Sequence, residues 1–183
     1  MFFTTKDRIP KERKITYANL ICNIRSKQSE THHVRLTEGG DKLDYPGDPS
    51  SPEVSLLNVK IHINSTISRA KNNARYMCIN IKNFYLGTPM KYFQYMRIHK
   101  KIIPQEVLDK YDIIFDDRDF TYVEISRSMY GLKEAGVIAF DQLILKLKRF
   151  GYETMPYTPR LWIHTSRKTT FKICVDDFGI QYF

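Results

Sequence analysis

The chain has 183 residues, of which 42% are apolar, and this is enough for one substantial core or two small ones. Its 29 lysines and arginines exceed its 20 aspartates and glutamates by 9 charges, which favours a nucleic acid partner over a merely solvated basic surface. The three cysteines stand far apart, which argues against a disulfide framework. Charged residues follow closely after the N-terminus, which argues against a secretory signal. No apolar run approaches the length of a membrane span. We therefore expect an intracellular protein, cytoplasmic or nuclear, without structural zinc.

The N-terminal third shows weak patterns. The first 30 residues are polar and basic, and we expect only a short helix around Ile15–Ile24. Residues 33–37 alternate between polar and apolar, which predicts a strand. The segment 39–49 is rich in glycine and proline and predicts a turn and loop.

A helix is predicted over residues 52–68. Ser50 and Glu53 match a capping box, in which each side chain bonds a backbone amide of the first turn. Apolar residues then follow at helical spacing, and two more widen the stripe, so we expect a well-buried helix. The stripe consists of Leu56, Val59, Ile63 and Ile67, widened by Leu57 and Ile61.

The middle of the chain predicts strands over residues 75–81, 94–99 and 122–125, and a short helix over residues 104–110. An acid-rich segment, residues 111–120, predicts an exposed loop. It contains the pair Asp116 and Asp117, which we interpret as solvated surface because no strand period surrounds it.

The C-terminal part carries the clearest pattern. Residues 134–150 predict an amphipathic helix that Gly151 ends, and strands are predicted over residues 161–164, 170–175 and 178–183. Strands and helices are mixed without regular alternation, which favours an α+β fold.

Asp176 and Asp177 lie at the tip of the hairpin predicted between the last two strands. Two carboxylates held there could bind Mg²⁺, which prefers oxygen ligands, and a pair of such ions can activate a hydroxyl for phosphoryl transfer. The alternative is an ordinary acidic turn, because aspartate before glycine is common in turns.

Three segments carry a resemblance. Residues 80–89 read Asn-Ile-Lys-Asn-Phe-Tyr-Leu-Gly-Thr-Pro, residues 128–136 read Ser-Met-Tyr-Gly-Leu-Lys-Glu-Ala-Gly, and residues 174–177 read Cys-Val-Asp-Asp. In order and spacing they resemble the first palm motif, the Leu-Tyr-Gly-Leu-Lys-Gln-Ala block and the aromatic-x-Asp-Asp motif of copia-type LTR-retrotransposon reverse transcriptases. Arg35-Leu36-Thr37 with the following glycine pair also looks like the fingers strand and turn. The likeness runs from about residue 34 to residue 183.

The resemblance implies a partial right-hand polymerase fold. Residues 1–74 would form an N-terminal extension and the fingers, and residues 75–183 the palm, an antiparallel sheet backed by the helices at 52–68 and 134–150. In the family, the thumb, connection and RNase H follow the catalytic hairpin, and we expect none of them within these 183 residues. We therefore expect the last strand to lie at an end of the sheet with little covering it.

The resemblance also implies a catalytic site. Asp176 matches the metal-ligating carboxylate, Asp177 its neighbour, and Mg²⁺, or alternatively Mn²⁺, would be the cofactor. Asn80 stands where the family has the aspartate that bridges both metals, and an amide lacks the charge that this role needs. We therefore expect weak or no polymerase activity. Asn83 replaces a frequent second aspartate of the family, which weakens the acidic character further, and Cys174 replaces the usual aromatic residue, a milder change.

For the nucleotide, the resemblance implies that Tyr85 lies under the incoming sugar and that Arg35 contacts the triphosphate. Gly131 lies in the segment that flanks the nascent base pair, and Glu134, at the family's glutamine, would bring an unfavourable charge near template phosphates. The implied partners are an RNA or DNA template-primer and a dNTP, with no membrane. The alternatives are a non-catalytic nucleic-acid-binding protein and a decayed remnant of an element.

Overall fold

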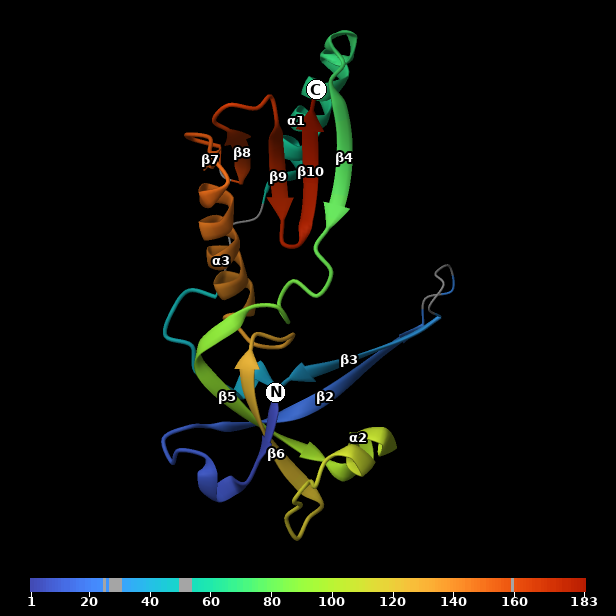
Figure 1. The fold of residues 1–183 in the computed structure, drawn as a ribbon, viewed down its shortest axis with the longest axis vertical. Helices are drawn as coiled ribbons and strands as arrows, with labels where there is room; N and C mark the ends of the chain where they lie inside the picture. Colours follow the sequence, from blue (N-terminus) through green and yellow to red (C-terminus); the bar gives the residue numbers. More distant parts are fainter. Residues whose placement is uncertain (25, 27–30, 50–53, 159) are drawn as a thin grey trace. The chain divides into compact units, whose positions relative to one another are not determined.

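The computed structural model describes residues 1–24, 26, 31–49, 54–158 and 160–183 (Figure 1). The chain forms two compact units, each built from two segments. Unit 1 comprises Met1–Pro49 and Tyr85–Ala135, and unit 2 comprises Ser50–Phe84 and Gly136–Phe183. Both units combine a β-sheet with helices, which confirms the α+β class. The expected boundary between fingers and palm, at residues 74 and 75, falls inside unit 2 and stays a prediction.

Unit 1 contains a sheet with the strand order β1-β6-β5-β2-β3. The β2 and β5 strands pair in parallel, and the other neighbours are antiparallel. The strands are β1 (Phe2–Thr4), β2 (Ile15–Ile24), β3 (His32–Glu38), β5 (Pro89–His99) and β6 (Phe120–Arg127). The helices are α2 (Gln105–Lys110) and the short 3-10 turns η1 (Lys6–Arg8), η2 (Gly40–Lys42) and η4 (Lys100–Ile102).

The expected helix at Ile15–Ile24 is wrong, because these residues form strand β2. The segment is rich in β-branched and aromatic side chains, such as Ile15, Thr16 and Tyr17, which lose rotamer freedom in a helix and suit a pleated sheet. It also pairs with β3 along most of its length. The strands, helix and acid-rich loop expected between residues 33 and 125 are confirmed, with β5 and β6 longer than expected.

Unit 2 contains an antiparallel sheet with the order β4-β10-β9-β8-β7. The strands are β4 (Arg75–Asn80), β7 (Tyr152–Thr154), β8 (Leu161–His164), β9 (Thr170–Cys174) and β10 (Asp177–Tyr182). The helices are α1 (Leu56–Ser68), α3 (Ala135–Arg149) and the 3-10 turn η3 (Ala70–Asn72). The expected hairpin and the helix before it are confirmed. The expectation that the last strand lies at an uncovered end is wrong, because β10 pairs on both sides, with β4 and β9.

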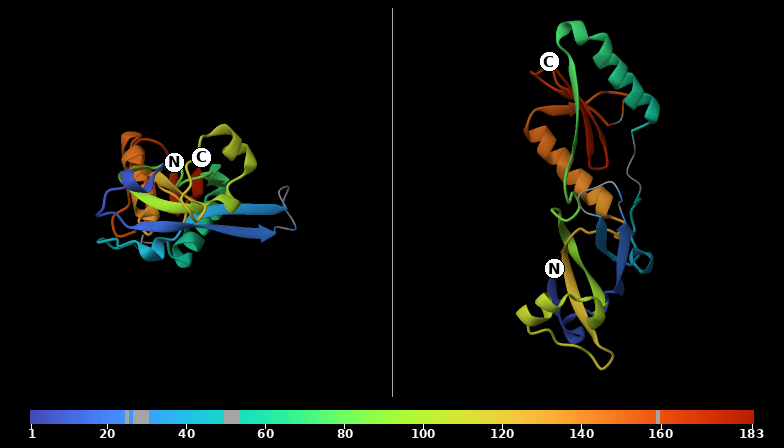
Figure 2. Two further views of the ribbon diagram at one scale, coloured as in Figure 1. Left: turned by 90° about the horizontal axis from the view of Figure 1, so that it is seen from below. Right: turned by 90° about the vertical axis from the view of Figure 1, so that its right-hand side faces the viewer.

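Helices α1 and α3 lie on opposite faces of this sheet (Figure 2). The α3 face forms the core of unit 2, where Trp162, Phe171, Ile173 and Phe178 are buried against apolar side chains of α3. Burying a side chain such as Phe171 stabilises the fold by about 1.5–3 kcal/mol. This face therefore supplies most of the hydrophobic stabilisation of unit 2.

The face of the sheet that α1 covers makes polar contacts with this helix. This contradicts the expectation that the apolar stripe of α1 is buried. His62 and Thr66 are the buried residues of α1, and His62 bonds Thr170 on β9 (Nε2 to Oγ1, 2.9 Å). Ser55 caps the helix by accepting a bond from the amide of Asn58, while the expected capping pair Ser50 and Glu53 lies outside the described residues. The apolar side chains of α1 that remain exposed are Leu56, Leu57, Ile61, Ile63 and Ile67.

Candidate functional site

The Asp176 and Asp177 pair lies at a two-residue turn between β9 and β10, where Cys174 faces Asp177 across the ladder. Val175 has a φ of 58°, a left-handed conformation that a β-branched residue rarely adopts and that costs of order 1–3 kcal/mol. The two flanking strands impose this conformation. It fixes the backbone from which both carboxylates project.

The sheet brings Asn80 to the same place. Asn80, the last residue of β4, is the register partner of Asp177, and its Nδ2 donates a hydrogen bond of 2.9 Å to Asp177 Oδ1. The next residue, Ile81, donates its amide to the carbonyl oxygen of Asp176 at 2.9 Å. Asn80 and Asp177 are exposed and Asp176 is half-buried. The three residues predicted for the catalytic site therefore form one cluster within unit 2.

The donor atoms of this cluster suit one magnesium ion. Its donors are two carboxylates and one amide, all oxygen ligands of the kind that Mg²⁺ prefers. In the part of the chain that the structure describes, no group of three or more histidine, cysteine, aspartate or glutamate side chains is placed to hold a metal. Two carboxylates balance the charge of one divalent ion, so the cluster fits a single hydrated Mg²⁺ better than two.

The residues predicted to contact the nucleotide lie in unit 1. The guanidinium of Arg35, on β3, lies 4.7 Å from the ring centroid of Tyr130, and the Tyr85 ring meets the same ring edge-on at 5.1 Å. Tyr130 thus joins two residues that are 50 positions apart in the sequence. Sequence reasoning did not single out Tyr130, although it is part of the middle block.

Gly131 shows why the middle block needs a glycine. Its φ is 100°, and a Cβ there would overlap the carbonyl oxygen of Glu38. The amide of Glu38 in turn donates to the carbonyl of Tyr130 at 2.9 Å. This close backbone contact holds the block against the end of β3, which positions Tyr130 over Arg35.

Glu134 is buried and accepts a hydrogen bond from Gln94 (Nε2 to Oε1, 3.1 Å). Glu38 is also buried, and neither of its carboxylate oxygens has a partner within the described residues. Burial, and then the charge of Glu134, raises the pKa of Glu38 to about 8. Sequence reasoning missed Glu38, which directly follows the strand predicted over residues 33–37 and is the last residue of β3. The negative charge of Glu134 therefore acts within unit 1, where it raises the pKa of Glu38.

Asp116 and Asp117 are exposed, as expected for the acid-rich loop. Asp116 also organises this loop, because its carboxylate accepts bonds from the amides of Arg118 and Phe120 and from the hydroxyl of Tyr122. These hydrogen bonds hold the pKa of Asp116 below its usual value, and the bond from the Phe120 amide contributes most. Asp116 is thus a turn-forming residue of unit 1.

No family model, curated protein or solved structure matches the chain. Among the residues that the structure describes, none of the helices has the length and apolar character needed to cross a bilayer. The two residue groups described above, each within its own unit, are therefore the candidates for function.

Proposed function

We propose that the chain is a reverse transcriptase domain of a copia-type retrotransposon polyprotein, an RNA-directed DNA polymerase by descent. The observation that carries the proposal is the pairing of Asn80 with Asp177 at the hairpin tip. Two sequence blocks that resemble palm motifs, almost a hundred residues apart, meet there. If each segment resembled a palm motif only by chance, there would be no reason for the two segments to meet at one end of a strand pair.

The arrangement in unit 1 supports the same proposal. The family resemblance assigns Arg35 to the triphosphate and Tyr85 to the sugar, and both side chains contact Tyr130. An Arg guanidinium and two aromatic rings in one group suit a nucleotide, which offers phosphates for the cation and flat surfaces for the rings.

In such a polymerase, Asp176 and Asp177 would hold Mg²⁺, which supplies positive charge for the transfer of a nucleotidyl group when bound. Asp176 and Asp177 would contribute the negative charge that attracts the cation. Asn80 contributes only a neutral amide. Its hydrogen bond also uses one lone pair of Asp177 Oδ1, so the amide competes with a cation for that oxygen.

We therefore propose that polymerase activity is weak or absent in this chain. Losing a bridging carboxylate lowers transition-state stabilisation, and each loss of about 1.4 kcal/mol slows the reaction tenfold. The direct test is primer extension on RNA and DNA templates, with Mg²⁺ or Mn²⁺. The unaltered chain should give little extension, and Asn80→Asp should raise it on the RNA template. Asn64→Asp, the same charge change on exposed α1, is the matched control.

The competing proposal is a nucleic-acid-binding protein without catalysis, which the net charge of +9 favours. Binding of a primer-template with and without Mg²⁺ separates the two. If Asp176→Ala leaves the effect of Mg²⁺ on affinity unchanged and Asn80→Asp gives no extension, the polymerase proposal fails and the binding proposal stands. Ordinary turnover by the unaltered chain would instead disprove the impairment.

A further inference from the structure

A hollow of about 410 Å³ opens on unit 1 where the start of β2 runs beside β5. The hollow belongs to unit 1, whereas the Asp176 and Asp177 pair belongs to unit 2. Three cationic side chains line it, together with the ring of Tyr17. The lining residues are Lys14, Ile15, Thr16, Tyr17, Lys42 and Arg97.

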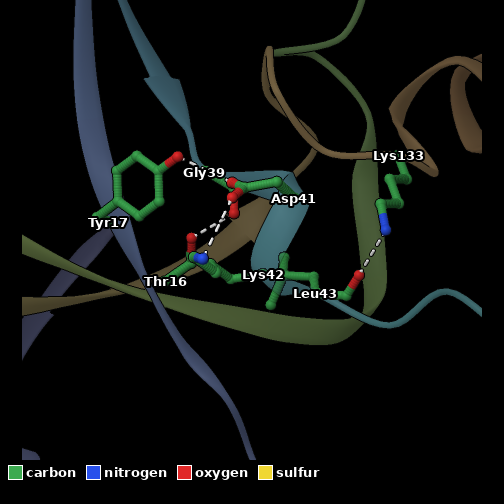
Figure 3. Close-up of polar contacts among 7 residues, drawn as sticks. All are labelled: Thr16, Tyr17, Gly39, Asp41, Lys42, Leu43 and Lys133. Carbon is green, nitrogen blue, oxygen red and sulfur yellow. Dashed lines mark hydrogen bonds and ion pairs between the residues drawn. The ribbon is translucent and has the colours of Figure 1, made fainter.

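The strand register explains why Tyr17 and Arg97 meet at this hollow. They are partners in the parallel β2 and β5 pair, so their side chains leave the sheet on the same side. The Tyr17 ring lies against Gly39, where a Cβ would overlap it, and its hydroxyl donates to Asp41 at 2.9 Å (Figure 3). These contacts hold the ring in place while 38% of the residue remains exposed.

The carboxylates around the hollow leave its cationic side chains available to bind a phosphate. Lys14 pairs with Asp44, and Lys42 lies 3.7 Å from Asp41, but the side chains in both pairs are more than half exposed. Exposed pairs of this kind contribute roughly 0–1 kcal/mol, so a phosphate can replace the carboxylate. Arg97 lies 5.0 Å from the Phe120 ring centroid and forms no ion pair with any described residue.

A second cationic and aromatic group lies next to the hollow. Arg13 directly precedes Lys14, and its guanidinium lies 5.7 Å from the ring centroid of Tyr92, while the Lys91 ammonium lies 5.3 Å from the same centroid. The pairing of β5 with β6 is irregular between Pro89 and Gln94, and Tyr92 is 60% exposed there. An exposed ring with cations beside it can stack a nucleotide base.

We propose that this surface binds single-stranded nucleic acid, with a backbone phosphate in the hollow and a base stacked on Tyr92. Arg97 lies five positions after Tyr92 along β5, at most roughly 17 Å away, so one short nucleic acid strand can reach both. A free phosphate would use the hollow alone. A duplex keeps its bases stacked on each other and would leave Tyr92 unused. The inference holds whether or not the chain polymerises.

The test is fluorescence anisotropy of fluorescein-labelled (dT)₂₀ with the full chain in EDTA, over a range of salt concentrations. The double variant Lys42→Gln/Arg97→Gln should lower affinity at least about fivefold at low salt and reduce the salt slope by about 1 per phosphate contact. Tyr92→Asn should also lower affinity at least about fivefold but leave the slope unchanged, because stacking releases no counterions. Asp44→Asn, which frees Lys14, should raise affinity about two- to fivefold.

Two controls match these changes. Lys101→Gln/Lys110→Gln removes the same charge elsewhere on unit 1, and Tyr157→Asn removes a fully exposed ring from unit 2. Both should stay within about twofold of the unaltered chain. Circular dichroism verifies that the variants fold. Photocrosslinking of bromouracil-substituted strands uses the unaltered chain, so it does not depend on the folding of any variant, and it should label Tyr92. Equal losses for site and control variants, or no labelling of Tyr92, would overturn the proposal.

Competition separates the possible sources of the phosphate. A 20-base-pair duplex and inorganic triphosphate should each displace (dT)₂₀ weakly. If heparin, duplex and (dT)₂₀ all bind alike and Tyr92→Asn has no effect, the surface attracts polyanions in general and the proposal is wrong. If triphosphate alone displaces the strand at equal phosphate concentration, the hollow binds a free phosphate compound instead.

Discussion

The side-chain amide of Asn80 donates a 2.9 Å hydrogen bond to Oδ1 of Asp177, its register partner across β4 and β10. An aspartate at position 80 would bring two carboxylates to this distance. Like charges directly opposite each other destabilise a sheet, and a bound cation removes that repulsion. Asn80 thus allows a stable hairpin tip in which no cation is required.

Asn80→Asp should therefore make the stability of unit 2 depend on Mg²⁺. Without Mg²⁺, repulsion between positions 80 and 177 should lower the free energy of unfolding of unit 2 by about 1 kcal/mol, a drop in Tm of roughly 4–8 °C for a unit of this size. Millimolar MgCl₂ should restore the Tm of the variant and leave the unaltered chain unchanged. The fluorescence of Trp162, the single tryptophan, which is buried in unit 2, reports the transition. Equal Tm values with and without Mg²⁺ would argue against a cation at this tip.

Glu38 should make unit 1 less stable as the pH rises. Its pKa is about 8 in the folded chain and 4.5 without the fold, so the folded state binds more protons between these values. Stability then falls with increasing pH across that window, by up to roughly 1.4 kcal/mol per pH unit. Glu38→Gln should remove this slope, while Glu106→Gln, on exposed α2, should keep it. Urea unfolding at pH 5, 6.5 and 8, followed by far-ultraviolet circular dichroism, measures both.

His62 should have the opposite effect on unit 2. Burial, and then the charge of Lys172, lowers the pKa of His62 from 6.5 to about 4. The unfolded state takes up the proton first, so stability is complete above pH 6.5 and falls as the pH drops towards 4, by roughly 3 kcal/mol in all. His62→Gln should flatten this acid limb, measured by Trp162 fluorescence during urea unfolding. The exposed His32→Gln should behave as the unaltered chain does, and a steep acid limb in His62→Gln would assign the titration to another group.

The exposed stripe of α1 predicts an unusual order of mutational effects. Leu57→Gln and Ile61→Gln should change stability by less than about 0.5 kcal/mol, because both side chains already contact water. Thr66→Leu places a larger apolar side chain in the tight polar contact with the sheet and should cost about 1–3 kcal/mol. Thermal unfolding of the three variants checks this. The reverse order would mean that the apolar stripe is buried in solution.

Sequence patterns predicted elements best where neighbouring residues decide the structure. The hairpin with Asp176 and Asp177 at its tip follows from two apolar runs around a polar pair, and α3 follows from a strong helical period. The pattern at Ile15–Ile24 was ambiguous, because its β-branched residues form a strand only when β3 and β5 are there to pair with it. The stripe of α1 is helical and the helix packs on the sheet, as expected, but the face that meets the sheet is that of His62 and Thr66 and not the apolar stripe.

The sequence alone determined the order of its elements, the basic charge and the three motif blocks with Asn80 among them, since these are properties of the chain itself. Only the tertiary structure decided that Asn80 faces Asp177, that Glu38 is buried beside the bonded Glu134, and that α1 turns His62 rather than its leucines towards the sheet. Each of these depends on strand register or on which face of an element meets another. Such choices are set by the summed packing of residues far apart in the chain, and local patterns carry no record of them.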